Sequence, residues 1–302
     1  MSLKYEILKR AVKVAGMKRA GKKSAEEIIE IKTTQNASNP IPELHDPEFE
    51  ISTMKVDGFT VLKMIHKAGI HKANLFIIGG GMVSAPRPGS IRKALRVAKE
   101  TGLDVFVPYY PLCTEYPITR AYEMIYALYQ KMLESYRAED ISLLGTSSGG
   151  NLALGLIAYM NANHSELPRP NYILAISPGT CPVTEEEKAR MKELDKKDVA
   201  ISAKYMITAE EIMRHGSDDV PDYMLHLQNG DFTNCPKVTF IYGTDEVLYA
   251  IAPSFEAAMK KYGVNFEMIV GEGLFHCYPV FPICKEGKDG WKMMIRLMKE
   301  NA

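Results

Sequence analysis

The alternation of apolar, β-prone runs with amphipathic segments constrains the fold of this chain more than any other sequence feature. Runs that predict strands lie at 49–56, 59–66, 74–78, 104–108, 141–144, 172–177, 237–242 and 265–270. Segments with apolar residues at helical spacing lie at 90–101, 118–136, 151–161, 253–262 and 291–300. Parallel strands are joined by crossovers of a dozen or more residues, usually helices. The pattern therefore predicts an α/β fold in which a mostly parallel central sheet carries helices on both faces.

The first two predicted strands differ from the rest because only Asp57-Gly58 separates them. Both turn positions of a tight hairpin require a positive φ, which Asp and Gly tolerate. The sheet is therefore expected to begin with an antiparallel hairpin.

Two segments stand outside this alternation. Residues 1–48 are polar and helical in pattern and end in the breaker-rich stretch Asn39-Pro40-Ile41-Pro42, and residues 181–234 are charged and helical with no convincing strand. Residues 49–180 and 235–302 then form one α/β core, and the two helical segments form a lid beside the strand ends. A single α/β domain with a lid accounts for the 302 residues.

Composition excludes several classes of protein. Lys plus Arg and Asp plus Glu both number 37, so the formal net charge is zero and a nucleic-acid partner is not expected. No apolar run approaches the 18 to 20 residues of a membrane span. The five cysteines include no CxxC pair, and the basic first two dozen residues lack the apolar core of a secretory signal. We expect reduced thiols, a cytoplasmic location, and no metal or cofactor.

A G-x-S-x-G motif, Gly145-Thr146-Ser147-Ser148-Gly149, lies between a predicted buried strand and a predicted helix. This context places the serine on a tight, strained turn at the carboxyl edge of the sheet, where open α/β sheets bind ligands. The free N–H groups at the start of the helix would face a developing anion. Ser147 is therefore the candidate nucleophile.

A serine nucleophile requires a base and an orienting acid. Among seven histidines, His276 alone lies in a loop that follows a late strand. Asp245 lies just past the strand 237–242, and Glu246 is a competitor that chemistry does not exclude. The order serine, acid, histidine is the one expected on this type of fold.

Acyl transfer also requires donors to an oxyanion. Gly79, Gly80 and Gly81 directly follow an early strand and would let exposed backbone N–H groups approach a ligand. A phosphate cradle would need a following Lys-Ser/Thr or a G-x-G-x-x-G pattern, and neither occurs.

Over residues 50–300 these motifs resemble the hormone-sensitive-lipase-like branch of the α/β-hydrolase superfamily. The matching stretches are GTSSGG at 145–150, GTDEVL at 243–248, and YPLCTEYP at 110–117, which is similar to the family segment YRLAPEHP. The resemblance implies Ser147 as nucleophile, His276 as base and Asp245 as acid. It also implies the N–H groups of Gly80, Gly81 and Ser148 as oxyanion donors, and a cap over an acyl pocket formed by residues 1–48 and 181–234.

Two positions depart from the family pattern. Ile78 replaces the histidine that precedes the glycines, and Thr146 replaces the aspartate of GDSAGG. Ile78 cannot brace the glycine loop through its side chain, although the backbone donors survive the change.

The expected function is a serine carboxylesterase that acts on short-chain, small-molecule esters without a cofactor. Met82, Tyr110, Tyr205 and Phe275 are candidates for lining the substrate pocket. A non-catalytic small-molecule binding protein, favoured only by the Ile78 departure, and an amidase or acyltransferase with the same triad are the alternatives. The chain could also form a homodimer.

Overall fold

The computed structural model describes residues 1–14, 18, 21–69 and 71–302. Its central element is an eight-stranded sheet with the order β1-β2-β4-β3-β5-β6-β7-β8. The strands are β1 (Phe49–Val56), β2 (Phe59–His66), β3 (Ala73–Ile77), β4 (Asp104–Pro108), β5 (Ile141–Thr146), β6 (Tyr172–Ile176), β7 (Lys237–Gly243) and β8 (Phe266–Gly271). From β4 to β8 all neighbours are parallel. The predicted fold class is confirmed.

The antiparallel start of the sheet is also confirmed. β1 and β2 pair with Val56 opposite Phe59, and the two residues between them, Asp57 and Gly58, have φ of 49° and 84°. These positive values are those that a two-residue hairpin turn requires. β2 then pairs antiparallel with β4 and joins the hairpin to the parallel part.

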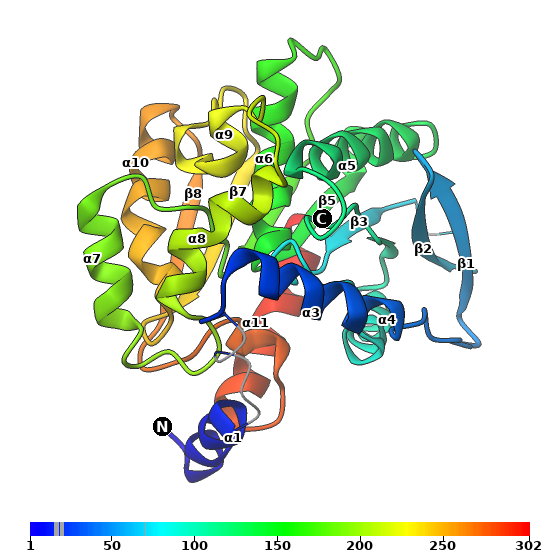
Figure 1. Cartoon of the computed structure of the whole chain (residues 1–302). Coiled ribbons are helices and arrows are strands. Elements are labelled where there is room, and N and C mark those ends of the chain that lie inside the picture. The colour runs from blue at the N-terminus through cyan, green and yellow to red at the C-terminus, as the bar shows by residue number, and fades with distance from the viewer. Residues whose placement is uncertain (15–17, 19–20, 70) are drawn as a thin grey trace.

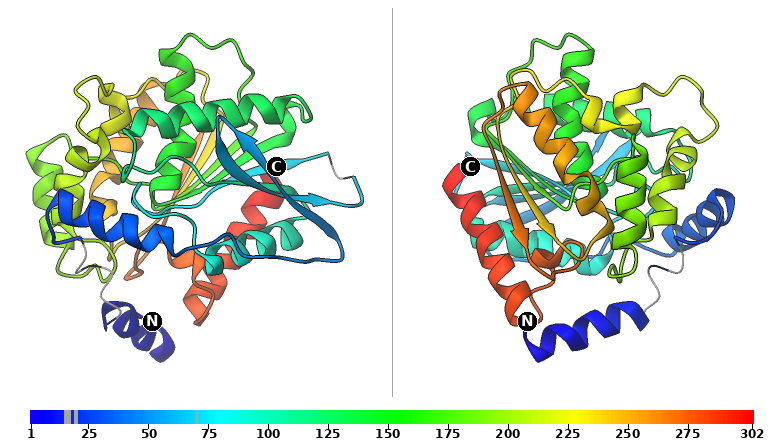
Figure 2. Two further views of the ribbon diagram at one scale, coloured as in Figure 1. Left: turned by 45° about the vertical axis from the view of Figure 1, so that its right-hand side comes forward. Right: turned by 90° about the vertical axis from the view of Figure 1, so that its left-hand side faces the viewer.

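Helices cover both faces of the sheet (Figures 1 and 2). The core helices are α4 (Pro88–Thr101), α5 (Ile118–Leu133), α6 (Ser148–Ala162), α10 (Ala252–Lys261) and α11 (Lys285–Asn301). α4 and α11 pack on one face, whereas α5, α6 and α10 pack on the other. Short 3₁₀ turns lie at Ala138–Asp140, Leu227–Asn229, Val247–Ile251 and Tyr278–Val280.

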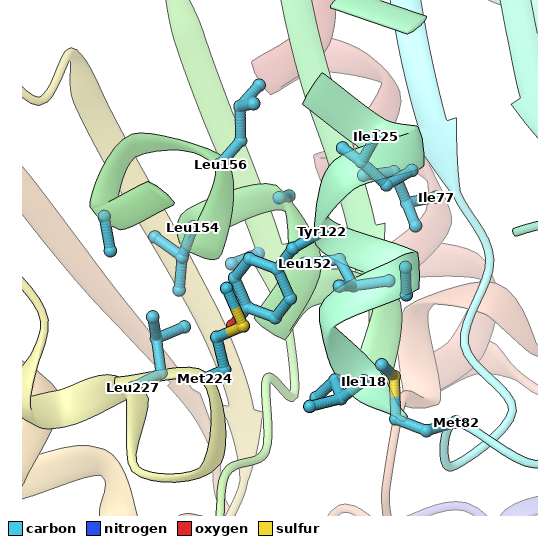
Figure 3. Packing of buried hydrophobic residues seen from close by; sticks show 14 of the residues in the cluster. Ile77, Met82, Ile118, Tyr122, Ile125, Leu152, Leu154, Leu156, Met224 and Leu227 are labelled. Atoms are coloured by element: carbon cyan, nitrogen blue, oxygen red, sulfur yellow. The ribbon is translucent and has the colours of Figure 1, made fainter. Parts of the chain in front are cut away.

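The two faces of the sheet form two hydrophobic clusters. In β3, Leu75 and Ile77 belong to the cluster under α5 and α6, whereas Phe76, and Ile78 just after the strand, belong to the one under α4 and α11. This alternation is the period-two pattern of a strand that is buried on both sides. Figure 3 shows part of the first cluster, which includes Leu152 of α6 and Ile118 and Tyr122 of α5.

The segments outside the alternation are helical, as expected. They contain α1 (Leu3–Val14), α3 (Ala25–Ala37), α7 (Glu185–Leu194), α8 (Ala203–Arg214) and α9 (Asp222–Leu225). α3 packs against α8, so the N-terminal segment and the insert are in contact. Within the described ranges, no helix has both the length and the apolar character needed to cross a membrane.

The helix boundary that differs most from the expectation is the start of α11. α11 begins at Lys285, six residues before the predicted start at Trp291, and includes Gly287 and Gly290. Glycine is unfavourable inside a helix, so the sequence pattern did not predict that residues 285–290 are helical. A Cβ at Gly287 would lie 1.9 Å from the Phe281 carbonyl oxygen, so the close packing requires glycine there.

Candidate active site

The turn between β5 and α6 carries Ser147. Its backbone has φ 53° and ψ −127°, which is strained for a residue with a side chain, and the side chain is half-buried. The flanking glycines permit this turn, since a Cβ at Gly145 would lie 2.4 Å from the Gly149 carbonyl oxygen and one at Gly149 would lie 1.9 Å from that of Ile77. The motif therefore has the strand–turn–helix context of a nucleophile.

The imidazole of His276 is held by Glu246. Nδ1 of the buried histidine lies 2.5 Å from Oε2 of the fully buried carboxylate. Asp245 was expected to be the carboxylate that orients this histidine, with Glu246 as the alternative. The structure has Glu246 in that contact, so the expectation for Asp245 is corrected.

Asp245 faces the N-terminal helix instead. Its Oδ2 lies 2.5 Å from Nζ of Lys9 in α1, and its Oδ1 lies 3.9 Å from Nζ of Lys197. The next residue, Glu246, has an extended backbone with φ −122° and ψ 145°. The two neighbouring carboxylates therefore have different partners, α1 for Asp245 and the histidine for Glu246.

The second oxygen of Glu246 is fixed by two further donors. Oε1 accepts the hydroxyl of Ser177 at 2.9 Å and the N–H of Gly243 at 2.7 Å. Ser177 Oγ in turn accepts the N–H of Cys277 at 3.0 Å, so it links the acid to the loop that carries His276. Sequence analysis missed Ser177, although its position directly after β6, at the carboxyl edge of the sheet, was a usable signal.

The other ring nitrogen of His276 faces Cys277. Nε2 lies 3.5 Å from Sγ of this buried thiol, and no hydrogen bond between His276 and the Ser147 hydroxyl occurs in the described part of the chain. The two loops still converge, because the Ile176 carbonyl accepts the Ser147 N–H at 2.8 Å and the Cys277 thiol at 3.7 Å. The loops that carry Ser147 and His276 therefore meet at the end of β6.

The charge state of His276 depends on these neighbours. Burial lowers its pKa, but the adjacent Cys277 thiol and the Glu246 carboxylate outweigh burial and hold the pKa well above the usual value for histidine.

The glycine loop after β3 offers fewer donors than expected. The N–H of Gly80 donates to Oγ of Ser148 at 2.9 Å, so it is not free for an oxyanion, and that expectation is corrected. The acceptor is the hydroxyl of the residue that follows Ser147. Among the described residues, no acceptor is found for the N–H groups of Gly81 and Ser148.

Side chains from three elements brace this loop. The N–H of Gly79 donates to Oγ1 of Thr146 at 3.0 Å, and the hydroxyl of Tyr110 donates to the Ile78 carbonyl at 3.1 Å. The hydroxyl of Tyr205, in α8 of the insert, donates to the Gly81 carbonyl. The loop is therefore fixed without the histidine that Ile78 replaces.

Three of the four candidate pocket residues lie together. Met82, Tyr110 and Tyr205 belong to one hydrophobic cluster beside the glycine loop. Phe275 belongs to the cluster on the opposite face of the sheet, where its ring packs against Tyr5 and Phe281. Phe275 therefore lies apart from the other three candidates.

A buried carboxylate of the insert, Asp198, also contacts the acid loop. Its Oδ2 accepts the N–H of Val247 at 2.7 Å, and its Oδ1 accepts that of Ala200 at 2.7 Å. Burial raises its pKa, and the nearby His276 opposes that rise. No sequence pattern predicted this contact, which joins the insert to the residue after Glu246.

The arrangement supports proton transfer and nucleophilic attack. A strained serine, a buried imidazole and a carboxylate that is hydrogen-bonded on both oxygens are the parts of a serine hydrolase site. Within the described ranges, no group of three or more His, Cys, Asp or Glu side chains is arranged to hold a metal ion.

Comparison with known proteins agrees with this geometry. Residues 74–280 match a family model described as the alpha/beta hydrolase fold. No relative among curated proteins matches the sequence.

Solved structures with a similar fold include several esterases. An esterase from the bacterial hormone-sensitive lipase family has a TM-score of 0.80 at 19% identity, over 100% of this chain and 99% of that one. An esterase/lipase from an uncultured bacterium has a TM-score of 0.79 at 17% identity, over 99% of both chains. EstE5 soaked with p-nitrophenyl butyrate has a TM-score of 0.79 at 18% identity, also over 99% of both chains. The chain belongs to the α/β hydrolase fold family, and it shares its fold with esterases of the hormone-sensitive lipase type.

Proposed function

We propose that this protein is a serine carboxylesterase that hydrolyses small, short-chain acyl esters through an acyl-enzyme intermediate. The observation that carries the proposal is the bond between His276 and Glu246 at the edge of the sheet where the strained Ser147 turn lies. The similar folds of the esterases named above agree with it.

In this mechanism Glu246 accepts a hydrogen bond from Nδ1–H of His276, which keeps the proton on Nδ1 and leaves Nε2 free to act as the base. The hydroxyl of Ser147 gives its proton to Nε2 as its oxygen attacks the ester carbonyl. His276 then returns the proton to the leaving alcohol, and water repeats the sequence on the acyl-enzyme. The N–H groups of Gly81 and Ser148 are the proposed donors to the oxyanion.

We propose that residues 1–48 and 181–234 act as the cap over this site. The bond from Tyr205 of the insert to the Gly81 carbonyl supports this role, because it brings the insert against the glycine loop. A Cβ on Gly81 would lie 2.8 Å from that hydroxyl, so side chains closely surround the loop. The limited space favours acetyl and butyryl esters over long acyl chains.

The test compares the wild type with Ser147→Ala on p-nitrophenyl acetate, butyrate and decanoate. Removal of the nucleophile should lower kcat at least about 10³-fold. Ser165→Ala is the matched control, since Ser165 is also half-buried but its hydroxyl bonds to Tyr126 away from the site. Equal rates for the wild type and Ser147→Ala would reject the proposal, and a faster rate on decanoate than on butyrate would reject the short-chain preference.

A further inference from the structure

Helix α1 has one deeply buried side chain, and this side chain lies against the loop of the proposed catalytic histidine. Tyr5 has 0% exposure, although most of the helix around it is exposed or half-buried. Its ring stacks on Phe275, the residue before His276, with centroids 5.5 Å apart and planes at 19°. Figure 1 shows α1 next to the start of α11, outside the layers of the core.

The hydroxyl of Tyr5 closes the turn that leads to the histidine. It accepts the N–H of Phe275 at 2.7 Å and donates to the Gly273 carbonyl at 3.1 Å. This loop includes two residues with a positive φ, Gly273 at 68° and Cys277 at 55°. A loop with such a backbone depends on contacts from outside to hold one conformation.

A second residue on the same face of α1 holds the other loop of the site. Lys9 lies four positions after Tyr5, so the two side chains share one face of the helix. Its Nζ bonds to Asp245, directly before Glu246. Ser2, three positions before Tyr5, donates its hydroxyl to Glu286 Oε2 at 2.7 Å, at the start of α11. Helix α1 and the residue before it thus contact the histidine loop, the acid loop and the helix that follows the site.

We propose that Tyr5 is a positioning residue for His276: its hydroxyl fixes the Gly273–Phe275 turn so that the imidazole keeps its bond to Glu246. The inference rests on the proposed esterase function for its kinetic consequence. Alignment matters because a displacement of about 1 Å in a catalytic group can cost about 10²-fold in rate. Helix α1 then serves the reaction itself, in addition to any role in a cap.

The test is Tyr5→Phe, which keeps the stacked ring and removes both hydrogen bonds. Its kcat on p-nitrophenyl butyrate should fall about 10- to 100-fold with KM within about twofold of the wild type. Tyr129→Phe is the matched control, because Tyr129 is also fully buried and its hydroxyl donates to the Pro168 carbonyl at 2.7 Å, away from the site. The thermal midpoints of the two variants should fall by similar amounts, whereas only Tyr5→Phe should lose kcat.

A second measurement does not depend on activity. NMR titration of the His276 ring, assigned by the signal that is lost in His276→Gln, should show a lower pKa in Tyr5→Phe because the bond to Glu246 loosens. An unchanged kcat and an unchanged titration would overturn the proposal, as would equal losses of kcat in both tyrosine variants. Failure of the esterase proposal would be seen separately, as hydrolysis that is equally fast in the wild type and in Ser147→Ala. In that case the NMR titration alone would test whether Tyr5 positions His276.

Discussion

Replacing Glu246 with glutamine tests the correction of the catalytic acid directly. Oε1 of Glu246 accepts two donors, the Ser177 hydroxyl and the Gly243 N–H. The amide oxygen of a glutamine would take that side, so its NH₂ group would face Nδ1 of His276 and could only donate to it. The imidazole would then carry its proton on Nε2, the atom that has to accept the proton of Ser147.

The size of the effect follows from this change of tautomer. Loss of the orienting carboxylate in a serine triad costs about 10³- to 10⁴-fold in kcat, or about 4 to 5.5 kcal/mol at 1.36 kcal/mol per tenfold. Asp245→Asn is the matched comparison, since it makes the same chemical change one residue earlier. It weakens a partly exposed ion pair with Lys9, worth at most about 1 kcal/mol, so kcat should stay within about fivefold of the wild type.

The assay is kcat on p-nitrophenyl butyrate at saturating substrate, with circular dichroism and the thermal midpoint measured for each variant. The reasoning fails if Asp245→Asn loses as much activity as Glu246→Gln, because the acid would then be Asp245. It also fails if folded Glu246→Gln keeps kcat within about tenfold of the wild type.

Two other changes test the electrostatics and the packing of the site. His276 acts as a base only when it is neutral, so its raised pKa places the acid limb of the pH profile of kcat/KM above about pH 6.5. Cys277→Ala should move that limb to lower pH, because the thiol helps to raise the pKa of His276. The control Cys235→Ala should leave the limb in place. The raised pKa of His276 also stabilises the folded state, fully so below about pH 6.5, and this stabilisation is lost as pH rises through the pKa of the folded protein. Thermal midpoints measured across pH can follow the loss. An acid limb that does not move in Cys277→Ala would contradict the role given to Cys277. Gly149→Ala should lower the thermal midpoint by at least about 6 °C or abolish soluble expression, because its Cβ would meet a backbone oxygen at 1.9 Å. Gly89→Ala is the control, since nothing lies within 4 Å of its Cβ, and equal midpoints for the two variants would refute the packing argument.

The elements that the sequence predicted well are those whose signals are local. The hairpin register follows from two turn residues that tolerate positive φ, and the parallel strands follow from apolar runs of the right length. The turn at Ser147 was predictable because glycines on either side of it are needed for the chain to pass. Such features depend on residues that are neighbours in the chain.

The missed features depend on contacts between distant segments. The choice between Asp245 and Glu246 depends on which of these two neighbouring side chains faces His276 in the folded chain, and no rule of sequence spacing decides this. The pairing of Gly80 with Ser148 joins two loops that are 68 positions apart in the sequence. Tyr5, 271 positions before His276, has the pattern of an ordinary core residue, and only the folded chain brings it to the histidine loop.

The glycine loop explains how the site can lack the histidine that precedes the glycines in the resembling family. An isoleucine side chain cannot accept or donate a hydrogen bond, so Ile78 by itself would leave the loop free to move. Thr146 and Tyr110 bond to the backbone on either side of the Ile78–Gly79 peptide, and Tyr205 bonds to Gly81. Because Thr146 is itself the second departure from the family motif, the two departures are connected: its hydroxyl accepts the N–H of Gly79, the residue that follows Ile78. Replacement of Thr146 by aspartate alone is therefore not expected to raise kcat, since the threonine hydroxyl already accepts the hydrogen bond from the Gly79 N–H.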